Sequence, residues 1–181
     1  MLRVLVMILS VLAGPLLADT QPSLPEAALK RIKSDPDRFF EAAAVLIHGY
    51  GTGGRINGAG VERFIAMERA GARAAAARRL MAADMNADGR IDADEIALLA
   101  AAASARSRGK LLTLQARADT DGDGSVSPAE LTAHAATEAV SAFPESRAQA
   151  ARAVLACDQD GDGQVDLPEV RRALAALEQA A

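Results

Sequence analysis

Residues 158–169 read DQDGDGQVDLPE, residues 119–130 read DTDGDGSVSPAE and residues 84–95 read DMNADGRIDADE. In chain order these are the first (84–95), second (119–130) and third (158–169) acidic loops. Each has Asp at position 1, Asp or Asn at 3, Asp at 5, Gly at 6, an aliphatic residue at 8 and Glu at 12. Short oxygen-bearing side chains at alternate positions are the ligands that a hard cation such as Ca²⁺ prefers. Three copies of one pattern predict three calcium-binding loops.

Each position of the pattern has its own expected task. Positions 1, 3 and 5 bring side-chain oxygens to one side of the ion, position 7 offers its backbone carbonyl, and position 9 ligates through a water. The Gly at position 6 permits the positive φ of a sharp turn, and the Glu at position 12 closes the shell with two oxygens. The predicted metal ligands are Asp84, Asn86, Asp88, Arg90, Asp92, Glu95, Asp119, Asp121, Asp123, Ser125, Ser127, Glu130, Asp158, Asp160, Asp162, Gln164, Asp166 and Glu169.

Helices are expected on both sides of each acidic loop. The residue at position 9 precedes the closing Glu by three, which is the spacing of a helix N-cap with a capping box. Apolar residues then fall at loop positions 13, 16 and 17, along one face of a helix, most clearly after the first and third acidic loops. The residues that hold the metal are therefore expected to begin the next helix as well.

A related segment precedes the first acidic loop by 35 residues. Residues 49–60, here called the glycine loop, read GYGTGGRINGAG and keep Gly54 at position 6 and Ile56 at position 8. Every carboxylate ligand is missing, so we interpret the segment as a helix–loop–helix unit that has lost its metal. Its G-x-G-x-x-G spacing is also found in phosphate-binding loops, but those follow a strand. The residues before the glycine loop look helical, which disfavours nucleotide binding.

On these motifs the chain resembles an EF-hand protein of the calmodulin superfamily in four-hand format, over roughly residues 36–181. The resemblance implies an all-α fold of paired helix–loop–helix units in two lobes, with short β-bridges between the loops. Pairing of consecutive hands would place Ile56 against Ile91 and Val126 against Val165. The expected units are a lead-in segment (19–35, with a short helix at 26–33), a first pair at 36–105 (degenerate hand 36–70, calcium hand 73–104), a linker at 106–110, and a second pair at 111–181 (calcium hands 111–142 and 146–178).

The N-terminal residues predict export. An early Arg3, an apolar run over 4–12 and small residues up to Ala18 are typical of a secretory signal peptide, residues 1–18, cleaved after Ala18. A membrane anchor is the alternative, but the run is shorter than the ~20 residues that a spanning helix needs. We expect a periplasmic or secreted protein of bacterial type, with no stable membrane insertion after cleavage.

Composition narrows the class of function further. Lys and Arg number 20 against 24 Asp and Glu, and the acids are concentrated in the acidic loops. Cys157 is the single cysteine, which excludes an internal disulfide; a buried thiol is favoured, with a disulfide-linked dimer as the alternative. No Ser/His/Asp or Cys/His constellation is found, so we predict neither an enzyme nor a nucleic-acid-binding protein.

The predicted function is calcium binding, as a Ca²⁺ buffer or a calcium-stabilised binding module. The alternative is a calcium-dependent regulator that docks on an envelope or secreted partner, whose identity the sequence leaves unknown. Sensors of that kind expose Met-rich grooves, whereas Met67, Met81 and Met85 are the methionines after the predicted cleavage site. Lanthanide binding is a lesser alternative, since the acidic loops lack the Pro at position 2 that such proteins carry.

Overall fold

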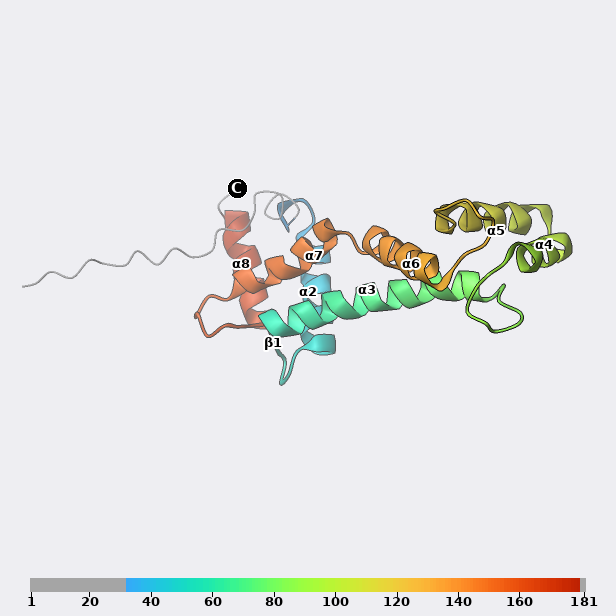
Figure 1. The fold of residues 1–181 in the computed structure, drawn as a ribbon. Coiled ribbons are helices and arrows are strands. Elements are labelled where there is room, and N and C mark those ends of the chain that lie inside the picture. The colour runs from blue at the N-terminus through green and yellow to red at the C-terminus, as the bar shows by residue number, and fades with distance from the viewer. Residues whose placement is uncertain (1–31, 180–181) are drawn as a thin grey trace, which may run out of the picture.

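The computed structural model describes residues 32–179. The predicted signal peptide and most of the lead-in segment lie outside these residues. The expected short helix at 26–33 is described only at its end, where residues 32–34 are helical. The predicted all-α fold is confirmed: helices alternate with loops, and the one sheet among the described residues has two short antiparallel strands (Figure 1). The elements are α2 (Pro36–Tyr50), β1 (Arg55–Asn57), α3 (Gly58–Met81), α4 (Ala93–Ala102), α5 (Ala105–Ala118), α6 (Pro128–Ala142), α7 (Glu145–Arg152), η1 (Ala153–Cys157), β2 (Gln164–Asp166) and α8 (Leu167–Gln179).

Two separate hydrophobic clusters divide the protein into two lobes. The terminal lobe takes its core from both ends of the described chain and includes Ile47 and Val170. The central lobe takes its core from the middle of the chain and includes Leu80 and Val126. In Figure 1 the terminal lobe, with α2, α7 and α8, lies at one end of an elongated molecule, and the central lobe, with α4 and α5, lies at the other.

Between residues 32 and 179 none of the helices combines enough length with enough apolarity to span a membrane.

The loops pair in a different order from the predicted one. Ile56 lies opposite Val165 in the ladder between β1 and β2, and Ile91 forms an isolated antiparallel bridge with Val126. The prediction that Ile56 pairs with Ile91, and Val126 with Val165, is therefore wrong. The glycine loop pairs with the third acidic loop in the terminal lobe, and the first acidic loop pairs with the second in the central lobe.

The length of α3 explains this order. It is a single helix of 24 residues, and at ~1.5 Å per residue its ends are roughly 36 Å apart. Its second half has no proline and is rich in alanine and arginine, which are strong helix formers. The helix therefore continues past Gly71 through residues 70–73, where the first two hands were expected to divide. The glycine loop and the first acidic loop lie at opposite ends of this helix, so they cannot pair.

The return path between the lobes is α6, which packs beside α3 (Figure 1). Ala76 on α3 and Ala135 and Ala139 on α6 are all buried, and their small side chains allow the two helices to approach closely.

The structure also differs from the expectation of a linker at 106–110. Those residues lie inside α5, which begins after Ser104 because the Ser104 side chain accepts a hydrogen bond from the backbone N–H of Ser107.

Ion pairs join α7 to α3 in the terminal lobe. Arg152 contacts Glu62 and Glu145, each at 2.6 Å, and Arg69 contacts Glu145 at 3.0 Å. Hydrogen bonds from these arginines lower the pKa of both glutamates. Because exposed pairs contribute only ~0–1 kcal/mol each, this cluster orients α7 more than it stabilises the lobe.

Cys157 is buried in the core of the terminal lobe, directly before the third acidic loop. Burial, followed by the nearby charge of Glu169, raises the pKa of its thiol from 9.0 to about 11. The free, buried thiol agrees with the interpretation of Cys157 that the sequence favoured, a buried core thiol.

Cys157 is therefore expected to react slowly with a thiol reagent in the native protein. Only the thiolate reacts, and the raised pKa lowers its fraction near neutral pH by about a hundredfold. The measurement compares release of the chromophore from a disulfide reagent by native and by urea-unfolded protein in the same buffer. Native protein that reacts as fast as the unfolded chain would contradict the burial of this residue.

Candidate metal centre

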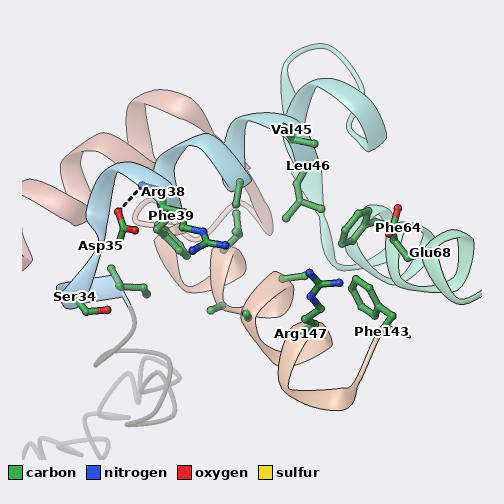
Figure 2. A pocket seen from close by; sticks show the side chains of 16 residues that line it. Ser34, Asp35, Arg38, Phe39, Val45, Leu46, Phe64, Glu68, Phe143 and Arg147 are labelled. Carbon is green, nitrogen blue, oxygen red and sulfur yellow. Dashed lines mark hydrogen bonds between the residues drawn. The ribbon is translucent and has the colours of Figure 1, made fainter. Parts of the chain in front are cut away.

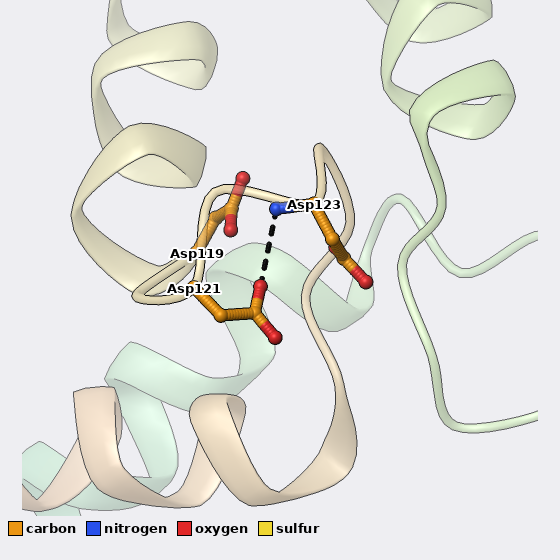
Figure 3. A group of neighbouring side chains, drawn as sticks. All are labelled: Asp119, Asp121 and Asp123. Carbon is orange, nitrogen blue, oxygen red and sulfur yellow. Dashed lines mark hydrogen bonds between the residues drawn. The ribbon is translucent and has the colours of Figure 1, made fainter.

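Each acidic loop is shaped by hydrogen bonds from its own backbone to the side chains at positions 1, 3 and 5. In the second acidic loop, Asp119 Oδ2 accepts from the N–H of Gly124 at 3.0 Å, and Asp121 Oδ1 accepts from that of Asp123 at 3.1 Å (Figure 3). Asp123 Oδ1 accepts from the N–H of Ser125 at 2.8 Å. The other two acidic loops repeat all three bonds, at 2.8–3.1 Å. The predicted side-chain ligands at these positions therefore surround a turn whose N–H groups hold them in place.

The turn depends on the glycine at position 6. Gly89, Gly124 and Gly163 have φ values of 83°, 86° and 77°, a region that residues with a Cβ rarely adopt. This conformation directs the N–H of position 6 back at the carboxylate of position 1.

The aspartates form two compact clusters. Carboxylate oxygens of Asp119, Asp121 and Asp123 all lie within 4.8 Å of one another, and the same holds for Asp158, Asp160 and Asp162. Figure 3 shows the three side chains of the second acidic loop around one turn of backbone. The first acidic loop has Asn86 at position 3, so only two of its residues at positions 1, 3 and 5 are aspartates.

The glutamate at position 12 links the end of each loop to its start. Glu130 Oε1 accepts from the N–H groups of Thr120 at 2.7 Å and Asp121 at 3.3 Å, while its Oε2 accepts from the N–H of Ser127 at 2.9 Å. Glu95 makes all three corresponding contacts in its own loop, and Glu169 accepts from the N–H groups of Gln159 and Asp166. The bonds from Ser127 and Thr120 lower the pKa of Glu130 to about 2, so it stays ionised at neutral and mildly acidic pH.

The residues at position 9 are helix caps, as the sequence predicted. Asp92 and Ser127 complete capping boxes with Glu95 and Glu130 at the starts of α4 and α6. Asp166 exchanges the same pair of bonds with Glu169, at 2.9 and 3.0 Å. One glutamate in each loop therefore joins the acidic cluster to the first turn of the following helix.

The residues at position 7 differ in what their side chains do. Arg90 reaches the partner loop, Ser125 is buried, and Gln164 lies in β2 opposite Asn57. Their expected contribution is a backbone carbonyl, and the complete ligand set remains a prediction from the sequence.

One buried oxygen shows that the donor set fits a cation. Asp84 Oδ1 is buried and has no hydrogen-bond partner among the described residues. The equivalent oxygens of Asp119 and Asp158 accept from the N–H of the position-4 glycines, Gly122 at 2.7 Å and Gly161 at 2.8 Å. A buried carboxylate oxygen without a partner is costly, and a hard cation bound by oxygen ligands would satisfy it.

Position 4 of the first acidic loop is strained as well. Ala87 has a φ of 59°, the only positive φ at a non-glycine residue among the described residues. Ala87→Gly is expected to stabilise the metal-free protein by about 1 kcal/mol, because a Cβ is disfavoured in this conformation. Urea unfolding measures the change. Ala74→Gly on the exposed face of α3 is the control, and it should destabilise by about 1 kcal/mol; a loss of stability in both variants would contradict the strain at Ala87.

Arginines cross between paired loops, which the sequence reasoning missed. Arg90 Nη2 lies 2.7 Å from Asp123 Oδ2, and Arg55 Nη1 lies 2.8 Å from Asp162 Oδ2. In each lobe, position 7 of one loop therefore contacts position 5 of its partner. Both arginines occupy position 7 of their loops, so the sequence contains this pattern. It predicts an ion pair only when it is known which two loops pair.

The glycine loop has no room for two of the missing side chains. A Cβ at Gly51 (position 3) would lie 2.2 Å from the carbonyl oxygen of Arg55, and one at Gly60 (position 12) would lie 2.8 Å from Ile56 Cγ1. Asn57 caps α3 by accepting from the N–H of Gly60 at 3.0 Å. The segment follows helix α2 rather than a strand, so it lacks the setting of a phosphate-binding loop.

Comparison with known families agrees with this geometry. Residues 77–100 and 116–133 match the family model of the EF hand, and these two regions contain the whole of the first and of the second acidic loop. No curated protein and no solved structure matches the chain significantly. These two regions of the chain are therefore similar to the EF hand, and the second of them contains the aspartate cluster of the second acidic loop.

Proposed function

We propose that this protein binds Ca²⁺ at its three acidic loops, and that the glycine loop is a fourth hand without metal. The observation that carries the proposal is the second acidic loop, where three aspartates lie within 4.8 Å and Glu130 closes the turn from the start of α6. The bridge between Ile56 and Val165 supports the fourth hand, because the glycine loop occupies the place of a partner loop.

The loop residues prepare the site in two ways. Backbone N–H groups orient the aspartates at positions 1, 3 and 5, so these side chains lose less freedom when they bind. The position-12 glutamates connect the starts of their own loops to the first turns of α4, α6 and α8. Bound Ca²⁺ would supply the positive charge that offsets the repulsion among these carboxylates.

Calorimetric titration of the metal-stripped protein tests the proposal. We expect three Ca²⁺ equivalents and weak competition from Mg²⁺, which prefers fewer protein ligands in a strict octahedron. Two or fewer equivalents would show that at least one acidic loop does not bind, and four would exclude a metal-free first hand. Titration with La³⁺ tests the lesser alternative, since a strong preference for the trivalent ion would favour lanthanide binding.

A calcium-dependent regulator is the second candidate, and one cavity favours it. A pocket of about 510 Å³ opens in the terminal lobe between α2, α3 and α7, within the ~300–1,000 Å³ of typical ligand sites. Figure 2 shows Phe39, Leu46, Phe64 and Phe143 around it. Such an apolar surface suits a partner that docks through hydrophobic side chains.

Fluorescence of a hydrophobic dye separates the two roles. A regulator should gain dye fluorescence when Ca²⁺ is added, because the pocket would open further. A buffer or calcium-stabilised module should gain thermal stability, since a ligand bound only to the native state raises it, while the dye signal stays unchanged.

Export is proposed from the N-terminal residues alone. Fractionation of expressing bacterial cells, with N-terminal sequencing of the mature chain, tests it. We expect Asp19 as the first residue of a periplasmic or secreted protein; an intact chain in the cytoplasm would exclude export.

A further inference from the structure

We propose that Arg55 of the glycine loop lowers the Ca²⁺ affinity of the third acidic loop by holding one of its ligands in an ion pair. The inference rests on the proposed calcium binding of that loop. It gives the metal-free hand a second task beside packing: it supplies a fixed positive charge to the site of its partner.

Both carboxylate oxygens of one predicted ligand, Asp162, have partners within the protein, and Arg55 is one of them. Arg55 Nη1 lies 2.8 Å from Asp162 Oδ2, and Asp162 Oδ1 accepts from the N–H of Gln164 at 2.8 Å. A cation that binds Asp162 through Oδ2 must displace the guanidinium, and one that binds through Oδ1 must do so beside its charge. In both cases the arginine opposes the cation.

The backbone holds Arg55 at this place. Arg55 lies opposite Asp166 in the ladder of β1 and β2, and the next residue, the buried Ile56, lies opposite Val165. Arg55 and Thr52 also exchange two backbone hydrogen bonds, at 2.8 and 3.2 Å. Gly51 permits this tight turn, because a Cβ there would lie 2.2 Å from the carbonyl oxygen of Arg55.

The central lobe repeats the contact at equivalent loop positions, between Arg90 and Asp123. In both lobes the arginine comes from the earlier loop in the chain and the aspartate from the later one. The second and third acidic loops carry Ser125 and Gln164 at position 7, so they return no cation to their partners. Each aspartate cluster thus faces an arginine from its paired loop, while the first acidic loop, with one aspartate fewer, faces none. Arg55 offers the cleaner test, because its own loop has no carboxylate ligand.

The expected effect is moderate, because the pair is partly exposed. The side chains of Arg55 and Asp162 retain 47% and 34% of their accessible surface, so solvent screens the interaction. Removal of the arginine charge should tighten Ca²⁺ binding by about twofold to fivefold at low salt. The gain should shrink as salt is added, since exposed charges are screened over ~10 Å at 0.1 M.

The experiment isolates the third acidic loop within the full mature chain. Glu95→Ala and Glu130→Ala together remove the closing carboxylates of the other two acidic loops, and this double variant is the parent. Calorimetric Ca²⁺ titration then compares the parent with Arg55→Gln, which removes the charge, and Arg55→Lys, which keeps it. Arg63→Gln is the matched control, because Arg63 is exposed on α3 and makes no ion pair with any described residue. Circular dichroism of each metal-free variant verifies the fold.

Tighter binding by Arg55→Gln, with Arg55→Lys and Arg63→Gln close to the parent, supports the proposal. Weaker binding by Arg55→Gln overturns it, since Arg55 would then position Asp162 for the metal. Equal gains in Arg55→Gln and Arg63→Gln also overturn it, because net charge alone would account for them. A parent that binds no Ca²⁺ refutes the proposed function of this loop itself, and the inference with it, whereas a parent that binds while Arg55→Gln changes nothing refutes only the inference.

Discussion

Glu130→Ala is expected to reduce the Ca²⁺ bound per chain from three equivalents to two. Glu130 contributes both oxygens of the expected closing ligand, and its contacts to Thr120, Asp121 and Ser127 span the second acidic loop. Without this side chain, the loop loses a bidentate ligand and half of the capping box that begins α6. Calorimetric titration of the metal-stripped protein measures the number of sites.

The control for this variant is Glu138→Ala. Glu138 lies on the same helix, and no hydrogen bond or ion pair involves its side chain among the described residues. It should bind three equivalents, like the unmodified protein. A Glu130→Ala variant that still binds three would show that the second acidic loop does not depend on its closing glutamate.

Ile56→Ala is expected to lower the free energy of unfolding by about 2–4 kcal/mol, and to weaken Ca²⁺ binding at the third acidic loop. Ile56 is 1% exposed, and truncation of such a buried side chain removes apolar contacts and leaves a cavity. Because Ile56 lies opposite Val165, the damage should pass to the loop that contains Val165. Urea unfolding gives the energy, and backbone amide NMR gives the affinity of each loop.

The position-6 glycines make the readout specific to each loop, because the N–H of each donates to the position-1 aspartate of its own loop. In Ile56→Ala, the resonance of Gly163 should require more Ca²⁺ to shift, while that of Gly89 should behave as before. Ile91→Ala should act instead on Gly124, since Ile91 bridges Val126. A change at Gly89 in Ile56→Ala would favour pairing of consecutive hands.

Val45→Ala is the control for the loss of stability on aliphatic truncation. Its side chain is 63% exposed, so this variant should change the free energy of unfolding by less than about 0.5 kcal/mol.

The local features of the acidic loops were predictable because their causes lie within a dozen residues. The aspartates at positions 1, 3 and 5 hydrogen-bond N–H groups two to five residues away, so their spacing alone indicates a turn around them. The caps at Asp92 and Ser127 depend on a glutamate three residues later. The all-α fold follows from these helix starts and from the apolar positions after each loop.

The sequence alone thus determined where the acidic loops lie, how they turn and which residues begin the helices that follow. Tertiary structure decided which loops meet, because pairing depends on whether the chain turns between two loops or continues as one helix. The unbroken α3 keeps the glycine loop from its neighbour in the sequence, and α6 leads the chain back to it. Arg55 and Asp162 are 107 residues apart in the chain, so no local pattern relates them. They meet because β1 and β2 form one ladder in the terminal lobe, and this contact brings a positive charge to a loop that its own residues make acidic.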